Sequence, residues 1–136
     1  KTLSLALIDL DRVRHINAEL GHQAGDRALR HAVKVLRKEL GREEPMIRAG
    51  GEEFVLVLRL PIGAAWERME VLRRKLEAAP FLPEPGVEPR RLTLSAGLAC
   101  CPQDANDLSG LMKRADERLR AAKAAGRNRV VARDGE

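Results

Sequence analysis

Residues 46–60, MIRAGGEEFVLVLRL, place two apolar runs on either side of a Gly-Gly-Glu-Glu link. Met46–Ala49 and Phe54–Leu60 have the composition of strands, and a short link that contains glycine predicts a β-hairpin between them. An ordinary turn does not require adjacent carboxylates. Glu52 and Glu53 are therefore either solvated turn residues or part of a metal site, and the hairpin by itself favours neither interpretation.

Length and composition set the limits within which this hairpin folds. The chain has 136 residues and is 44% hydrophobic, which fits a single domain with one core. No apolar run reaches the roughly 20 residues that a membrane span needs, so we expect no membrane insertion. The only cysteines, Cys100 and Cys101, are adjacent and lack metal-binding spacing. We interpret them as reduced thiols, which are typical of the cytoplasm.

The positive charge of the chain allows a polyanionic partner. The formal net charge is +5, yet aromatic residues make up only 2% of the sequence. Proteins that bind single-stranded nucleic acids usually present aromatic stacking platforms. The basic residues are also scattered instead of being gathered in a tail. We therefore expect no nucleic-acid partner and interpret most of these charges as a solvated surface.

The pattern along the chain predicts an α+β fold. After a strand at Leu3–Leu10 come turn signals at Gly21 and Gly25. The other predicted elements are helices at Asp26–Leu40, Ala65–Ala79 and from Asp107 or Ser109 to Ala125, strands at Arg91–Cys100 and 127–132, and an irregular proline-rich loop at 80–89. The first six elements match a ferredoxin-like split βαβ sheet, which is mostly antiparallel with helices packed around it.

Two acids at the end of the first predicted strand are candidates for chemistry. Asp9 and Asp11 lie two residues apart, so they face the same side of a strand. We expect Asp11 to cap the following helix, whereas Asp9 lies at the edge of the core. The split βαβ arrangement brings Asp9 near Glu52 and Glu53. Carboxylates from neighbouring strands suit a Mg²⁺ site for phosphoryl or nucleotidyl transfer.

Four segments of the chain, in order, resemble the GGDEF family, the diguanylate cyclases. RAGGEEF resembles the family signature in its GGEEF form. DLDRVRHIN…GHQAGD, LTLSAGLA and RADERLRAAKAAGRNRV are similar to its other characteristic segments, with matching spacing. The resemblance covers essentially the whole chain. It implies a palm-type, nucleotidyl cyclase-like fold and a diguanylate cyclase that condenses two GTP molecules into cyclic di-GMP with release of two pyrophosphates.

The resemblance also implies the catalytic groups. The carboxylate of Asp9, the carbonyl of Leu10 and the carboxylate of Glu52 would hold Mg²⁺, with Mn²⁺ as a substitute. Glu52, or a metal-bound species beside it, would accept the proton of the attacking 3′-hydroxyl, and Glu53 would support the metal site. Arg14 stands at the position of the family's lysine near the phosphates. Each domain would hold one GTP, so catalysis would require a homodimer.

Five further residues match the nucleotide-binding positions of the family. Asn17 and Asp26 would read guanine, whose donors and acceptors their side chains complement. His22 lies in the same loop, either contacting the nucleotide or capping the turn after Gly21. Lys123 and Arg127 match the pair that grips the β- and γ-phosphates. Basic residues at a helix end that complement the macrodipole are the alternative for this pair.

The chain departs from the family pattern at several positions. Ala18 replaces the usual acid and Arg120 replaces the usual tyrosine, which favours a second hypothesis, a weak or inactive GTP-binding regulatory domain. Gly41 and Glu44 stand where the family's RxxD product-inhibition site begins and ends. We therefore expect no standard inhibitory site.

The start of the chain also differs from that of the family. No initiator methionine and no N-terminal family helix precede the first strand. We expect residues 1–136 to be a single catalytic domain excised from a longer multidomain protein. A sensor or receiver domain would be fused to it, in a cytoplasmic protein or on the cytoplasmic side of a membrane-bound sensor.

Overall fold

The computed structural model describes residues 2–135, and within them the chain forms five strands and four helices. In chain order they are β1 (Leu3–Asp11), α1 (Val13–Leu20), α2 (His22–Glu39), β2 (Met46–Gly50), β3 (Glu53–Leu58), α3 (Ile62–Glu77), β4 (Thr93–Cys101), α4 (Leu108–Ala124) and β5 (Arg129–Val131). The α+β class predicted from the sequence is confirmed.

The strands form one sheet in the order β2-β3-β1-β4-β5. Strand β1 lies at its centre and runs antiparallel to both β3 and β4, whereas β5 runs parallel to β4. The β2-β3 hairpin is therefore beside the first strand, as the split βαβ pattern predicts.

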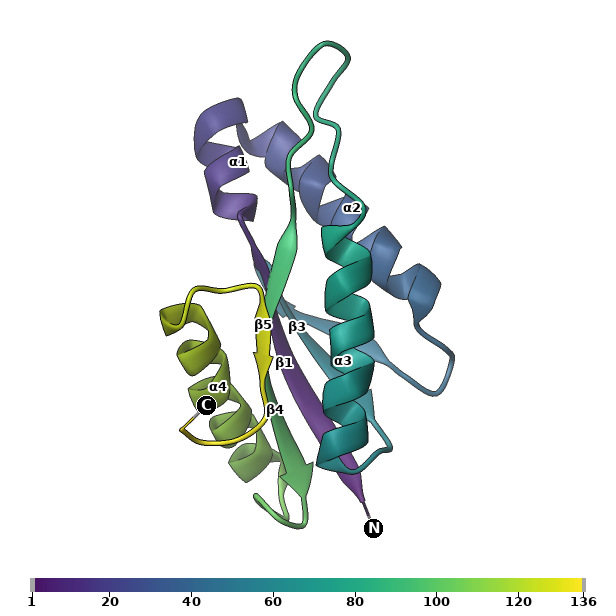
Figure 1. Cartoon of the computed structure of the whole chain (residues 1–136), viewed down its shortest axis with the longest axis vertical. Coiled ribbons are helices and arrows are strands. Elements are labelled where there is room, and N and C mark those ends of the chain that lie inside the picture. Colours follow the sequence, from purple (N-terminus) through teal and green to yellow (C-terminus); the bar gives the residue numbers. More distant parts are fainter. Residues whose placement is uncertain (1, 136) are drawn as a thin grey trace.

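Helices cover both faces of the sheet. Figure 1 shows α2 and α3 on one side and α4 on the other. Ala6, Ile8 and Leu10 of β1 pack into the core under α2 and α3, while Leu5 and Leu7 pack against α4. Alternation along the strand places Asp9 and Asp11 on the α4 face as well. The third predicted helix therefore covers the face to which both acids point.

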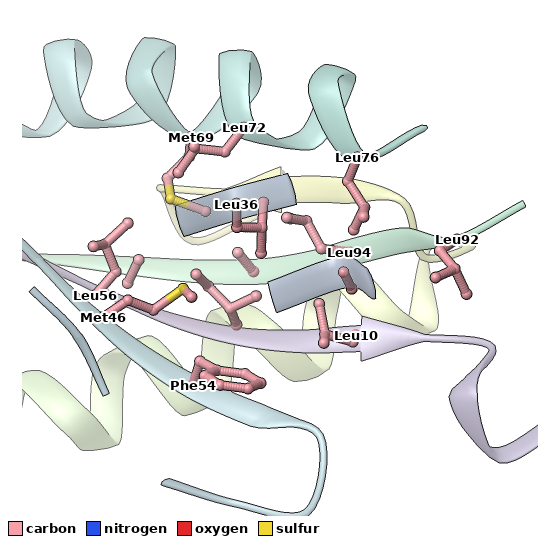
Figure 2. Packing of buried hydrophobic residues seen from close by; sticks show 14 of the residues in the cluster. Leu10, Leu36, Met46, Phe54, Leu56, Met69, Leu72, Leu76, Leu92 and Leu94 are labelled. Atoms are coloured by element: carbon pink, nitrogen blue, oxygen red, sulfur yellow. The ribbon is translucent and has the colours of Figure 1, made fainter. Parts of the chain in front are cut away.

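The larger hydrophobic cluster lies between the sheet and the α2-α3 layer. Met69, Leu72 and Leu76 descend from α3 toward the sheet, and Leu36 reaches the same region from α2 (Figure 2). Phe54, the residue that follows the two glutamates of the hairpin, is only 2% exposed and belongs to this cluster. The start of β3 is therefore anchored in the core directly beside its acidic turn.

The segment after β1 differs from the sequence prediction. The helix expected at Asp26–Leu40 is present but begins four residues earlier, at His22, so the turn expected at Gly25 is absent. An additional helix, α1, precedes it, and the two meet at Gly21, whose φ is 95°. Gly25 lies inside α2, where a Cβ atom would stand 1.6 Å from Oδ1 of Asn17. Glycine at this position leaves room for the side chain of Asn17 and does not form a turn.

The remaining elements agree with their predictions. Asp107 caps α4 by accepting a hydrogen bond of 2.9 Å from the backbone amide of Gly110. The proline-rich segment is irregular apart from one bridge between Phe81 and Arg90, and it extends beyond the ends of the neighbouring elements in Figure 1. Both cysteines are free thiols.

None of the helices within residues 2–135 combines the length and the apolar character that crossing a bilayer requires.

Arginine side chains tie several elements together. Four of them each direct two nitrogens at both oxygens of one carboxylate, with N–O distances of 2.6 to 2.9 Å, and we call these pairs the arginine forks: Arg68–Glu44, Arg73–Glu70, Arg90–Glu19 and Arg118–Asp104. Three of them join separate parts of the fold, since only Arg73–Glu70 lies within one helix. Such two-pronged contacts fix geometry better than a single ion pair does.

Candidate functional site

The functional residues predicted from the sequence converge at one end of the sheet. Asp9 pairs with Glu53 across β1 and β3, and the backbone amide of Leu10 donates to the carbonyl of Glu52 at 3.0 Å. The predicted proximity of Asp9 to the two glutamates is therefore confirmed. The β1 end and the acidic turn form one continuous backbone frame for the site.

The hairpin turn is held in place and is not a freely solvated loop. Gly51 has a left-handed φ of 47°, a conformation that favours glycine, and its carbonyl accepts a 2.8 Å hydrogen bond from Nε of Arg48. The side chain of Glu52 is only 19% exposed, and its Oε1 lies 3.0 Å from Nε of Arg14 on α1. Glu53 is half-buried.

A second ion pair connects β1 with the end of α4. The Nζ atom of Lys123 contacts Oδ2 of Asp9, and both side chains are largely buried. Lys123 thus points into the site instead of only complementing the helix macrodipole. Asp9 and Glu52, the two carboxylates expected to bind metal, thus each form an ion pair with a basic side chain, Lys123 and Arg14 respectively.

Asp11 has a different role from the one that its position before a helix indicates. The residue that precedes α1 is Arg12, with φ 76°, and no side chain caps this helix. The expectation that Asp11 caps α1 is therefore wrong. Its buried carboxylate instead accepts hydrogen bonds from Thr93 and Ser95 on β4 and from the backbone amide of Asn128.

These groups surround a cleft of about 740 Å³, a volume typical of sites for small molecules. Seven of the residues predicted from the sequence line it: Asp9, Leu10, Arg14, Glu52, Glu53, Lys123 and Arg127. Acidic and basic side chains therefore line the same cleft. Such a lining suits a ligand that carries phosphates together with a divalent cation.

Asn17 and Asp26, which are expected to read guanine, and their predicted neighbour His22 lie outside the lining of this cleft. Asn17 is on α1, whereas His22 and Asp26 are in the first two turns of α2 and are exposed. The side chain of Asn17 lies close to Gly25, where α1 passes α2. Asn17 thus shares α1 with the cleft residues Arg14 and His15 but lies outside the lining itself.

Several cleft residues were not assigned by reasoning from the sequence. Arg12, Arg91 and Arg129 line the cleft and add to its positive charge, and His15 lines it as well. Asn128 follows Arg127 and contacts Asp11. Asn128 could have been predicted as a site residue, because it belongs to the GRN segment on which the family resemblance partly rests.

The residues present fit a hard divalent cation bound together with phosphates. Within residues 2–135, no group of three or more His, Cys, Asp or Glu side chains could hold a metal by itself. Asp9 and Glu52 supply two carboxylates to the cleft, and the backbone of Leu10 lines it as well. Magnesium is commonly held by one or two carboxylates, with substrate phosphates and water completing its shell.

The positions that correspond to the inhibitory RxxD pattern have a structural role. Glu44 accepts an arginine fork from Arg68 and a hydrogen bond of 2.8 Å from the amide of Gly41. The hydrogen bond from Arg68 is the main reason that the pKa of Glu44 lies below its usual value. This carboxylate is thus engaged in joining the segment before β2 to α3.

The fold and the cleft define an α+β domain with an acidic and basic site at one end of a mixed sheet. The chain belongs to the GGDEF family: the family model described as "Diguanylate cyclase, GGDEF domain" matches residues 1–129.

Curated relatives include multidomain signalling proteins. The chain is 38% identical over 130 residues to the diguanylate cyclase DgcP of Pseudomonas aeruginosa, covering 94% of this chain and 19% of that protein. It is 35% identical over 130 residues to the response regulator PleD of Caulobacter vibrioides, covering 95% and 29% respectively. The chain thus spans less than a third of the length of these two relatives.

Solved structures of GGDEF domains share the fold closely. The GGDEF domain of YfiN from Pseudomonas aeruginosa superposes with a TM-score of 0.89 at 29% identity, covering all of this chain and 84% of that one. The active GGEEF domain of a diguanylate cyclase from Vibrio cholerae gives a TM-score of 0.86 at 29% identity, covering 100% and 85%.

Proposed function

We propose that this chain is the catalytic domain of a diguanylate cyclase, which condenses two GTP molecules into cyclic di-GMP and two pyrophosphates. The observation that carries the proposal is the meeting of Asp9 and Glu52 with Lys123 and Arg127 around one cleft. A nucleoside triphosphate with its cation needs both acidic and basic partners, and this cleft offers both.

Asp9, Glu52 and the carbonyl of Leu10 would hold Mg²⁺, or Mn²⁺ in its place. When bound, the cation neutralises phosphate charge and lowers the pKa of the attacking 3′-hydroxyl. Without a ligand, Lys123 pairs with Asp9 and Arg14 pairs with Glu52. When GTP binds, both basic side chains would contact phosphate oxygens instead of these carboxylates. The site would thereby keep its charges compensated in both states.

Glu52 serves in this proposal as the proton acceptor for the 3′-hydroxyl of the second GTP. Its side chain lines the cleft and is 19% exposed, which supports this role. Attack of that oxygen on the α-phosphorus forms the new ester bond, and pyrophosphate leaves. Glu53, half-buried beside Asp9, supports the turn that carries Glu52.

Substrate binding would divide between the two regions of the site. Asn17 and Asp26 would bind the guanine edge, with His22 beside them. Lys123 and Arg127 would bind the β- and γ-phosphates, with Arg127 able to form a two-pronged contact.

The proposed enzyme acts as a homodimer, because each domain holds one GTP. The relatives are much longer than this chain, which supports a fused sensor or receiver domain that brings two catalytic domains together in the cytoplasm. Residues 1–136 would then be one catalytic domain of the larger protein.

Mass spectrometry of a reaction with GTP and MgCl₂ tests the proposal, with the chain fused to a dimerising coiled coil. Cyclic di-GMP should form and should disappear when EDTA is added. Glu52→Ala should abolish the product. Glu84→Ala is the matched control, because Glu84 is an exposed acid in the proline-rich loop, and it should retain activity. No product at high enzyme concentration would refute catalysis.

A GTP-binding regulatory domain without turnover is the second candidate function. Ala18 is exposed on α1, and Arg120 pairs with Asp116 on the surface of α4 at 3.1 Å, so both departures from the family pattern lie on the surface. Tight GTP binding by the dimeric fusion without product would favour this candidate.

A further inference from the structure

The carboxylate of Asp11 is among the most enclosed charged groups of the fold. Its side chain is 1% exposed. From β4, Oγ1 of Thr93 donates to it at 2.8 Å and Oγ of Ser95 at 2.8 and 3.0 Å. From the opposite side, the backbone amide of Asn128 donates at 3.1 Å. A buried carboxylate requires such compensation, and here its lone pairs are used by donors of the chain itself.

The segment that Asp11 contacts after α4 has an unusual backbone. Arg127 and Asn128 both adopt left-handed conformations, with φ of 66° and 50°, which are uncommon for residues other than glycine. Two such residues in succession persist only where their surroundings hold them. We call residues 126–128 the phosphate turn, because Arg127 is its candidate phosphate ligand.

The phosphate turn is held from two sides. On one side, Asp11 accepts from the backbone amide of Asn128. On the other, the side chain of Asn128 accepts from Nη1 of Arg73 at 3.0 Å and donates to Oε2 of Glu77 at 3.0 Å, both on α3. The turn is thus clamped between the end of β1 and the end of α3.

The guanidinium of Arg127 is held much less firmly than its backbone. Its Nη1 lies 3.4 Å from Oδ1 of Asp11, and 53% of its side chain is exposed at the cleft. The hydrogen bond from the backbone amide of Asn128 to Asp11 therefore fixes the position of the neighbouring Arg127 backbone. The side chain of Arg127 is left available to a ligand.

We propose that Asp11 is a positioning residue for phosphate recognition: it fixes the phosphate turn so that Arg127 faces the cleft. This inference rests on the proposed function, since it concerns how that site holds the β- and γ-phosphates of GTP. Asp11 acts through Arg127 and does not touch the nucleotide. Asp9, two residues earlier on the same face, contacts Lys123 and belongs to the cation site.

Calorimetric titration with 3′-deoxy-GTP and Mg²⁺ tests this role, because this analogue lacks the attacking hydroxyl and cannot turn over. Asp11→Asn keeps the size of the side chain but removes its charge and one of its two acceptor oxygens, so the donors from β4, Arg127 and the backbone amide of Asn128 can no longer all be accepted. It should weaken 3′-deoxy-GTP binding roughly tenfold, the size of a lost charge-assisted hydrogen bond. Binding of GMP, which lacks the β- and γ-phosphates, should be unchanged.

A double-mutant cycle separates positioning from general destabilisation. If Asp11 acts through Arg127, then Asp11→Asn combined with Arg127→Ala should bind 3′-deoxy-GTP no more weakly than Arg127→Ala. Ser95→Ala is the matched control, because it removes a donor to Asp11 that is not part of the phosphate turn. It should lower the melting temperature and change 3′-deoxy-GTP affinity by less than about twofold.

Additive losses in the cycle, or equal weakening of GMP and 3′-deoxy-GTP, would overturn the role of Asp11. Should Asp11→Asn not fold, Arg127→Ala alone still tests the role, because Asp11 is proposed to act through Arg127. Unchanged 3′-deoxy-GTP affinity in Arg127→Ala would also overturn the proposal. If the unaltered chain does not bind 3′-deoxy-GTP, the proposed function itself fails, and this inference fails with it.

Discussion

Gly97 on β4 allows the sheet and α4 to approach more closely than any other residue would permit. A Cβ atom at this position would stand 2.1 Å from the carbonyl oxygen of Ala115 and 2.3 Å from the amide nitrogen of Leu119. Both are backbone atoms of α4, so no side chain can rotate away. Gly97→Ala therefore requires movement of the whole helix.

The size of the effect follows from these distances. Restoring an ordinary contact of 3.4 Å from 2.1 Å requires α4 to retreat by about 1.3 Å. Overpacking against a rigid neighbour destabilises by about 3 kcal/mol, at the upper end of the usual range. For a domain of this size, that corresponds to a fall in Tm of roughly 10 °C.

Differential scanning calorimetry and urea unfolding would measure this change, with Gly63→Ala as the matched control. Gly63 lies in the first turn of α3, and a Cβ there would have no heavy atom within 4 Å. The same substitution should raise stability by about 0.5 kcal/mol, because alanine restricts the unfolded chain. If Gly97→Ala melted within about 2 °C of the unaltered chain, the close approach would not be required.

Two further predictions concern the nucleotide region and acid stability. Gly25→Ala should displace the side chain of Asn17, since the new Cβ would lie 1.6 Å from its Oδ1. Because Asn17 is proposed to bind the guanine edge, binding titrations should show that the variant no longer distinguishes GTP from ATP. Acid stability should depend on Asp104: burial opposes its ionisation, but hydrogen bonds from Arg118 and a backbone amide outweigh this, so its pKa is lowered in the folded state. The unfolded chain then takes up the proton first, and stability falls as the pH drops below about 4 and through the lower folded pKa. Asp104→Asn should make unfolding curves between pH 5 and 2 less dependent on pH, whereas an unchanged slope would contradict this account.

The parts of the fold governed by local pattern could be predicted from the sequence. The apolar run of β1, the hairpin and the amphipathic helices α3 and α4 each carry their signal within a few residues. Helix α1 was missed because it is short, has no side-chain cap and begins after the left-handed Arg12. Gly25 gave a false turn signal, since its glycine serves helix packing against Asn17.

The site was predictable where family segments mark it and less so where contacts are distant. The proximity of Asp9 to Glu52 and Glu53 could be predicted because the split βαβ pattern places β1 beside the hairpin. Asp11 was misassigned because an acid before a helix commonly caps it. Its true partners lie at positions 93, 95, 127 and 128, far along the chain, so no local rule could identify them.

The arginine forks make the stability of this fold depend on temperature in a particular way. Removing charged groups from water becomes less unfavourable on heating, whereas hydrophobic stabilisation levels off. Ion pairs that join separate elements, such as Arg68–Glu44 and Arg118–Asp104, therefore contribute a larger share of the stability at high temperature than at 25 °C. Lysine cannot reproduce the two-pronged contact. Replacing either arginine by lysine should therefore lower the free energy of unfolding more at high temperature than at 25 °C.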